Sequence, residues 1–155
     1  MNVDRPPSNQ DLDRVEGVIA RWAATQEAEN PAVVAAERGE PGQRRWYLRL
    51  RGESRDVFTV WLTVRQRTLR HETYFMPPPA TNAQRLYAHL LGRNHALRSM
   101  RFSIGDEDAV FVVGEFAVDD VDETSLDRML GGVYQVVEQN FTAAMRIGYE
   151  GTFRG

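Results

Sequence analysis

Hydrophobic and polar residues alternate most clearly between Val57 and Met76, and this pattern predicts a β-hairpin. β-Branched and aromatic residues dominate both arms, and the polar run 65–68 forms the turn between them. With this turn, one face of the hairpin carries four opposed pairs: Val64 with Leu69, Leu62 with His71, Val60 with Thr73, and Phe58 with Phe75. This face is almost wholly apolar, so we expect it to lie against the core.

The second face of the hairpin is amphipathic, because aromatic side chains alternate there with charged and hydroxyl groups. Its opposed pairs are Thr63 with Arg70, Trp61 with Glu72, Thr59 with Tyr74, and Val57 with Met76. Such a face is too apolar for open water, which indicates either a covering helix or a binding partner. The predicted partner-binding residues are Thr59, Trp61, Thr63, Arg70, Glu72 and Tyr74.

The rest of the chain is predicted to supply three helices, three further strands and one segment that forms a turn or a short strand. A helix over 9–26 begins with a capping box of Ser8 and Asp11, and a second capping box at Thr81 and Gln84 begins a helix that ends near Asn94. The other predicted elements are a turn or short strand at 31–38, strands at 45–51, 100–104 and 109–118, and a helix at 124–146. This order, α-β-β-β-α-β-β-α, predicts an α+β domain with an antiparallel five-stranded sheet packed by helices.

The domain is predicted to span residues 9–147, between a flexible arm at 1–8 and a frayed tail at 148–155. Three glycines lie inside predicted elements, where glycine lowers the stability of a strand or a helix. We expect Gly114 to mark a bulge, and we expect another element to pack against the backbone at Gly131 and Gly132.

Composition narrows the class of protein. The 155 residues, with 42% hydrophobic residues, are enough for one domain with a sizeable core. There is no cysteine, which excludes disulfides and thiolate metal sites. No apolar run is long enough to span a membrane and the first residues are polar, so a cytoplasmic protein without a membrane association is expected.

The net charge of −3 combines two regions of opposite charge. Residues 44–70 contain eight arginines and two carboxylates, whereas residues 106–127 contain nine carboxylates and no arginine. The simplest interpretation is two solvated faces. The alternative is attraction between two copies of the chain, which favours a homodimer.

Candidate chemistry is sparse, and we predict no enzyme, no catalytic residue, no cofactor and no metal site. His71 and Glu72 are adjacent on a strand, so their side chains point to opposite faces. His89 and His95 are six apart on a helix, which is unsuitable for binding one metal ion. The acidic runs 106–108 and 119–123 lack the spacing of a calcium loop.

The residues therefore favour a non-enzymatic protein-binding module. The alternative is single-stranded nucleic-acid binding through the arginine-rich segment 44–70, whose arginines alternate with Tyr47, Trp61 and Tyr74. The acidic second half of the chain makes nucleic acid the less favoured partner.

Several segments resemble the YbjN domain, a bacterial family also labelled sensory transduction regulator. They are 46–52, 60–69, 72–77, 90–94, 114–115 and 126–131. The resemblance implies a fold similar to type III secretion chaperones, often dimeric. It also implies a chaperone-like or regulatory role through protein contacts, with an unidentified protein partner and without a known activity or cofactor.

Overall fold

The predicted hairpin is formed by strands β3 (Val57–Val64) and β4 (Thr68–Met76). In the computed structural model, which describes residues 5–155, the two strands pair from Val64 opposite Leu69 to Val60 opposite Thr73, in the predicted register. The three predicted pairs farther from the turn lie beyond this paired stretch. There β4 contains a bulge between Tyr74 and Met76, where it pairs with the neighbouring strand β6 (Val110–Ala117). The irregularity is therefore in β4, and the prediction of a bulge at Gly114 is wrong.

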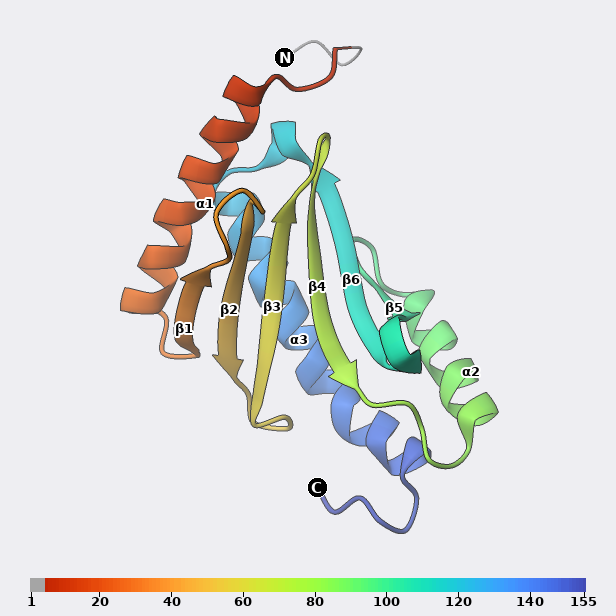
Figure 1. Cartoon of the computed structure of the whole chain (residues 1–155). Helices are drawn as coiled ribbons and strands as arrows, with labels where there is room; N and C mark the ends of the chain where they lie inside the picture. The colour runs from red at the N-terminus through yellow and green to blue at the C-terminus, as the bar shows by residue number, and fades with distance from the viewer. Residues whose placement is uncertain (1–4) are drawn as a thin grey trace.

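Six strands form one antiparallel sheet in the order β1-β2-β3-β4-β6-β5 (Figure 1). The remaining strands are β1 (Val33–Arg38), β2 (Arg45–Arg51) and β5 (Arg101–Ile104). Short 3₁₀ turns, η1 (Asp106–Asp108) and η2 (Val118–Asp120), stand before and after β6. The element order is thus α-β-β-β-β-α-β-β-α when the 3₁₀ turns are left aside.

The prediction of five strands is wrong, because β1 is a sixth strand at the edge of the sheet. Its sequence, VVAAER, has small residues where a strand usually carries large ones, so its alternation is weak. Its register also shifts between Val33 and Ala35. The strand forms because β2 offers it a complete row of hydrogen-bonding groups, which is a tertiary contact that local patterning does not reveal.

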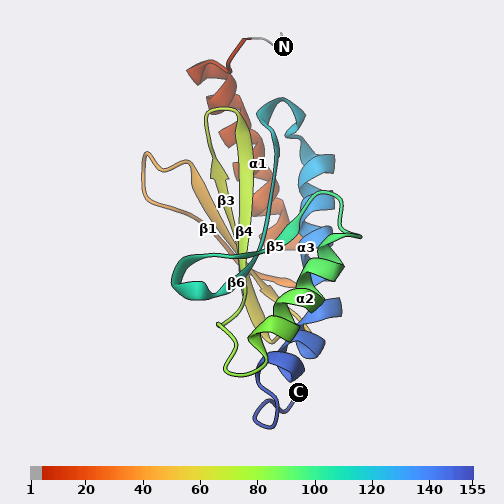
Figure 2. The ribbon, with the colours of Figure 1, turned by 90° about the vertical axis from the view of Figure 1, so that its right-hand side faces the viewer.

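Three helices cover one face of the sheet: α1 (Asn9–Glu29), α2 (Ala83–Asn94) and α3 (Glu123–Gly148). Figure 2 shows α2 and α3 on one side of the strands, with the turn that carries η1 projecting toward the other side. Buried residues from all three helices and from the same face of the strands form one cluster. None of the helices in residues 5–155 is long and apolar enough to cross a membrane.

The helix ends agree only in part with the predicted caps. The Ser8 and Asp11 capping box is present at the start of α1. The predicted box at Thr81 is wrong, because Asn82 caps α2 in the left-handed conformation without a side-chain cap. The Thr81 hydroxyl instead donates to the carbonyl of Gly148, so packing against the end of α3 decides its partner.

The two ends of the chain differ in what the structure describes. Residues 1–4 of the predicted arm lie outside the described residues, and residues 5–8 lead into α1. The predicted tail 148–155 contacts the domain: the Tyr149 hydroxyl donates to the carbonyl of Pro78 at 2.5 Å, and the Phe153 ring lies 6.1 Å from that of Phe141. α3 itself continues to Gly148, two residues beyond its predicted end.

Candidate partner-binding face

The six predicted partner-binding residues lie together on the face of the sheet that the helices leave open. Their side chains alternate with the buried ones along β3 and β4. The large aromatics among them are well exposed, Trp61 at 37% and Tyr74 at 38%. The helix α2, which could have covered this face, packs against α3 and β5 instead. No helix of the described chain covers the six residues, so the second face of the hairpin is open.

Aromatic side chains pair across the strands of the open face. The rings of Tyr47 and Trp61 meet edge to face at 6.3 Å between centroids, and those of Tyr74 and Phe111 do so at 5.6 Å. Such pairs add to the stability of the sheet and hold the rings in fixed orientations. The open face therefore carries two pairs of contacting aromatic rings.

A small second hydrophobic cluster lies on this face, separate from the main core. It consists of Ala109, Phe111 and Val113, all on β6 or immediately before it. Phe111 packs against Gly105, where a Cβ atom would lie 2.6 Å from its ring. The sequence showed apolar residues on both faces of this strand, but it did not assign them to the candidate surface, since the pairing of β4 with β6 is a long-range contact.

Charged groups on the open face are only partly neutralised. Arg70 and Glu72 form an ion pair at 2.7 Å, and the Arg45 guanidinium donates to the Thr63 hydroxyl at 3.1 Å. Arg49 and Arg51 are exposed and have no carboxylate within 4.0 Å among residues 5–155. These two arginines can therefore pair with carboxylates of a partner.

A shallow hollow of about 280 Å³ opens between β1, β2 and β3 on the same face. It is lined by Ala35, Glu37, Tyr47, Arg49, Thr59 and Trp61. Trp61 and Thr59 belong to the predicted surface, whereas Ala35 and Glu37 come from the strand that the sequence did not establish. The β-branched pair of Val33 and Val34 at the start of the strand is the local signal that could have placed them.

At each edge of the sheet a side chain bonds to part of the outward-facing backbone. At β1 the Glu27 carboxylate accepts a hydrogen bond from the backbone N–H of Ala36 at 2.6 Å. At β5 the Asn94 amide takes the place of a neighbouring strand, since it accepts from the N–H of Phe102 at 2.7 Å and donates to its carbonyl at 3.1 Å. A partner strand needs free backbone groups at an edge. The structure thus favours the open face, and not an edge, for recognition.

His71 lies on the core face of β4, as predicted, and its side chain is 2% exposed. Burial, together with the nearby positive charges of Arg70 and Arg101, lowers its pKa to about 4, so the imidazole is neutral at pH 7. The ring packs over Gly114, where a Cβ atom would collide with His71 Nε2 and would lie 2.5 Å from the carbonyl oxygen of Ser99. Gly114 is therefore required by close packing.

The other groups with possible chemistry do not converge. No group of three or more His, Asp or Glu side chains within residues 5–155 is arranged to hold a metal ion. His89 is half-buried on α2, where partial burial and the charges of Arg93 and Arg85 lower its pKa. His71 lies on β4 and His89 on α2.

Comparison with known proteins identifies the family. The family model for YbjN, described as putative bacterial sensory transduction regulator, matches residues 11–145. An uncharacterized protein of Mycobacterium tuberculosis is 29% identical over 105 residues, covering 68% of this chain and 57% of that protein. An uncharacterized protein of Mycobacterium leprae is 26% identical over 113 residues, covering 73% of this chain and 61% of that protein. The chain thus spans about three fifths of the length of these relatives.

Among solved structures, the fold is similar to that of the Yersinia pestis type III secretion chaperone SycH, crystallised in complex with a stable fragment of YscM2. The TM-score is 0.53 and the identity 15%, covering 79% of this chain and 96% of that chain. At this identity the likeness establishes the fold alone, which is the expected chaperone-like α+β arrangement. Because the family model extends over nearly the whole of the helices and the sheet, this chain belongs to the YbjN family.

Proposed function

We propose that this chain is a non-enzymatic protein-binding module with a chaperone-like or regulatory role, which acts in the cytoplasm as a homodimer. The observation that carries the proposal is the open sheet face, with Trp61 and Tyr74 exposed in fixed orientations. Exposed aromatic rings with little conformational freedom are typical anchors of protein interfaces. The family and the fold support a role in protein contacts.

The partner segment is expected to be apolar and acidic. Its apolar side chains would cover the rings and the hollow beside Trp61. Its carboxylates would pair with Arg49 and Arg51, which have no carboxylate partner in residues 5–155. Thr59, Thr63, Arg70 and Glu72 complete the proposed contact surface and supply hydrogen-bonding groups around the rings. Burial of the aromatics would supply affinity, and the charges would supply specificity.

Affinity capture from cells of the source organism tests this function. The intact chain is expected to retain a protein that the Trp61→Ala/Tyr74→Ala variant retains at least about tenfold less well, since two anchors are lost. The control is Gln135→Ala on the exposed surface of α3. This variant should retain as much of the captured protein as the unaltered chain does. Circular dichroism and urea unfolding check that the double variant still folds. Equal retention by both variants would contradict the proposal.

Single-stranded nucleic acid is the second candidate for the same face. Arg49 lies beside Tyr47 and Trp61, and Arg51 lies farther along the same strand, as in surfaces that stack bases and bind phosphates. The carboxylates of Glu37, Glu72 and Glu115 lie on the same face and would repel the phosphates, which argues against this candidate. Binding to a labelled single-stranded oligonucleotide, measured from low to physiological salt, distinguishes nucleic-acid binding from protein binding. If the chain binds protein, as we propose, it should not bind the oligonucleotide even at low salt.

A further inference from the structure

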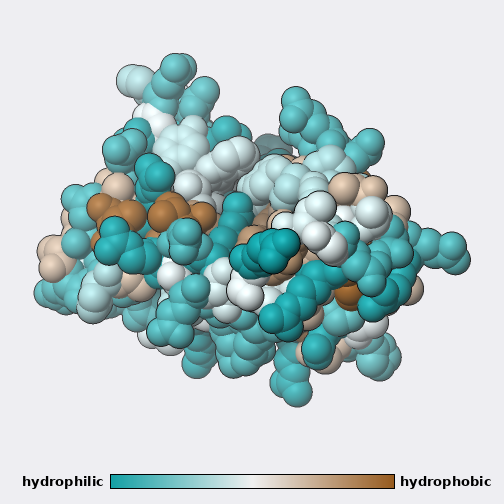
Figure 3. All heavy atoms as spheres, turned by 90° about the horizontal axis from the view of Figure 1, so that it is seen from below, coloured by the Kyte–Doolittle hydropathy of each residue, from teal (hydrophilic) through white to brown (hydrophobic). Residues whose placement is uncertain are grey.

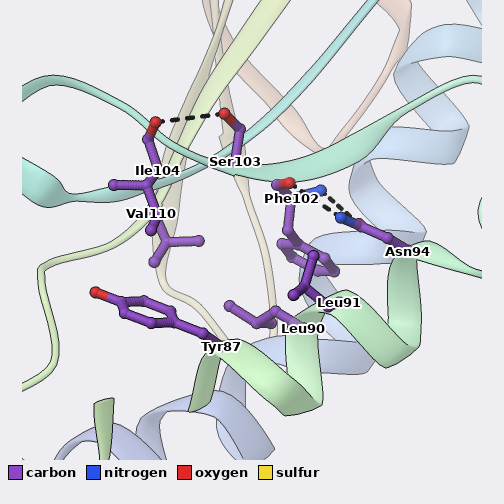
Figure 4. Close-up of a pocket in the computed structure, with 8 residues that line it drawn as sticks. All are labelled: Tyr87, Leu90, Leu91, Asn94, Phe102, Ser103, Ile104 and Val110. Atoms are coloured by element: carbon purple, nitrogen blue, oxygen red, sulfur yellow. Dashed lines mark hydrogen bonds between the residues drawn. The ribbon is translucent and has the colours of Figure 1, made fainter. Parts of the chain in front are cut away.

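Two of the hollows in the described chain differ in the chemistry of their walls. The apolar groove between α2 and β5 has a volume of about 250 Å³, and hydrophobic side chains such as Phe102 and Ile104 dominate its lining (Figure 4). None of the residues that line it is charged. The second hollow, here called the terminal hollow, has a volume of about 730 Å³ and combines charged with aromatic side chains. It is lined by residues 53–57, 141–142 and 153–155.

The terminal hollow lies at the lower end of the molecule, where the turn between β2 and β3 meets the C-terminal residues (Figure 1). Seen from below, this end is mainly hydrophilic, with smaller hydrophobic patches between the polar groups (Figure 3). The Glu138 carboxylate of α3 accepts hydrogen bonds from the backbone N–H groups of Glu53 and Ser54 in this turn. The backbone that leads to Arg55 is therefore held against α3.

Arg55 is half-buried in the wall of the terminal hollow, and aromatic rings hold its guanidinium group. The guanidinium carbon lies 5.6 Å from the centre of the Tyr74 ring and 5.4 Å from that of the Phe141 ring. One of its N–H groups donates to the backbone carbonyl of Tyr74. These contacts use only part of a group that has five N–H donors. The remaining donors can bind a ligand.

The positive charge of Arg55 has no ion-pair partner in the part of the chain that the structure describes. Among residues 5–155, no carboxylate lies within 4.0 Å of it. Burial lowers the pKa of Arg55, because the charged guanidinium is partly removed from water. A charge that has lost part of its hydration is stabilised by an opposite charge that forms hydrogen bonds with it. The terminal hollow thus favours an anionic ligand.

The other walls of the terminal hollow indicate what kind of anion fits. Val57, Phe141 and Phe153 supply apolar surface, and the two phenylalanine rings meet edge to face at 6.1 Å. An aromatic ring of a ligand can pack against them in the same way. The exposed carboxylates of Glu53 and Asp56 also line the hollow. They would repel a phosphate group more strongly than a carboxylate, which carries a single charge.

We infer that the terminal hollow binds a small monocarboxylate whose body is an aromatic ring. The carboxylate accepts hydrogen bonds from Arg55, and the ring packs against Phe141 and Phe153. Arg154 lines the same hollow, is exposed and has no ion pair within residues 5–155, so it supplies a second positive charge. This ligand site goes beyond the proposed function. It shares only Tyr74 with the proposed contact surface of the open face.

Titration calorimetry of the full chain with 3-phenylpropionate and with 3-phenylpropionamide tests the inference. The two probes have the same ring, so they differ in the charge that Arg55 would bind. The acid is expected to bind at least about tenfold more tightly than the amide. Arg55→Gln should remove this preference, and Arg55→Lys should keep part of it, since lysine retains the charge without the planar fork. The control is Arg146→Gln, an exposed arginine of α3 outside the hollow, which should leave the preference unchanged.

The comparison of the two probes on the unaltered chain does not depend on any variant, and circular dichroism checks that the Arg55 variants fold. Equal binding of acid and amide, or no binding of the acid up to about 10 mM, would overturn the inference. Tighter binding of inorganic phosphate, or of a peptide that ends in phenylalanine, would overturn the choice of a small monocarboxylate. Capture of a protein by the open face enters none of these measurements, so the two proposals can fail separately.

Discussion

At the scale of single residues, His71 has the most unusual environment. It is a buried imidazole whose Nδ1 has no hydrogen-bond partner among the described residues. Its predicted place on the core face is confirmed. The side chain fits because Gly114 leaves room for it on the neighbouring strand. The alternation of the strand predicted the face, whereas the partner glycine belongs to a segment 43 positions further along the chain.

His71 gives the stability of the protein a defined pH dependence. Its pKa is about 4 in the folded chain and 6.5 when unperturbed, so the unfolded chain binds the extra proton between these values. The stabilisation is complete above pH 6.5 and is lost as the pH falls to about 4, a total of about 3 kcal/mol. Urea unfolding from pH 7.5 to 4.5 should show a shallower decline for His71→Gln. An equal loss of stability with falling pH in the two proteins would contradict the assignment of this pH dependence to His71.

Gly114 and Gly131 are predicted to respond to alanine in opposite ways. Gly114→Ala should destabilise the fold by about 1–3 kcal/mol, since its Cβ would overlap the His71 ring. Gly131→Ala should stabilise it by up to about 1 kcal/mol, because nothing lies within 4 Å of the added atom in the helix α3. The urea concentrations at half-unfolding of the two variants show whether each substitution stabilises or destabilises the fold. Destabilisation by Gly131→Ala would show a contact at that site.

The helical glycines also correct a prediction. We expected an element to pack against both, but only Gly132 has such a neighbour: a Cβ there would lie 2.9 Å from the Met100 methyl group. Gly131 borders the hollow between α1 and α3. The glycine pair thus predicted correctly that another residue approaches the α3 backbone closely. The tertiary structure places this contact at Gly132 and not at Gly131.

At the scale of elements, the turn between β2 and β3 is held by a carboxylate of α3. The Glu138 side chain accepts hydrogen bonds from the backbone N–H groups of Glu53 at 3.0 Å, Ser54 at 2.6 Å and Arg55 at 3.5 Å. Gly52 is needed beside it, since a Cβ there would collide with the carboxylate and lie 2.5 Å from the carbonyl of Arg55. The turn residues were visible in the sequence, but their partner 83 to 85 positions away was not.

Removing this contact should loosen the turn without unfolding the domain. Glu138→Ala is predicted to cost about 1–2 kcal/mol, because the three N–H groups lose a charged acceptor at a site that water reaches. The neighbouring Gln139→Ala, exposed on the same helix, is the control and should change stability little. Thermal unfolding measures the loss of stability, and faster hydrogen exchange at the Ser54 amide would show that the loss lies at this turn. Unchanged exchange at the turn would contradict this role.

At the scale of the whole molecule, the proposed dimer couples stability to concentration. If two copies associate, the folded state is stabilised by mass action. The melting temperature of the full chain is then expected to rise as the concentration increases from low to high micromolar. Differential scanning calorimetry measures this dependence. A melting temperature independent of concentration for the unaltered chain would argue against the dimer.

Features that depend on neighbouring residues could be predicted from the sequence. These are the three helices, the capping box at Ser8, the register of the central hairpin near its turn, and the division of its residues into two faces. Each is set by a local period of hydrophobic and polar side chains, which the backbone geometry of one helix or two adjacent strands converts directly into structure.

What covers each face of the sheet became known from the arrangement of the elements in space. It added β1 as a sixth strand, placed all three helices on one side, and left Trp61 and Tyr74 open on the other. It also brought α2 beside β5 to form the apolar groove. These features depend on contacts between segments far apart in the chain, whose free energy comes from shared burial. The pattern of any one segment shows that a face must be buried, but it does not contain the identity of the neighbour.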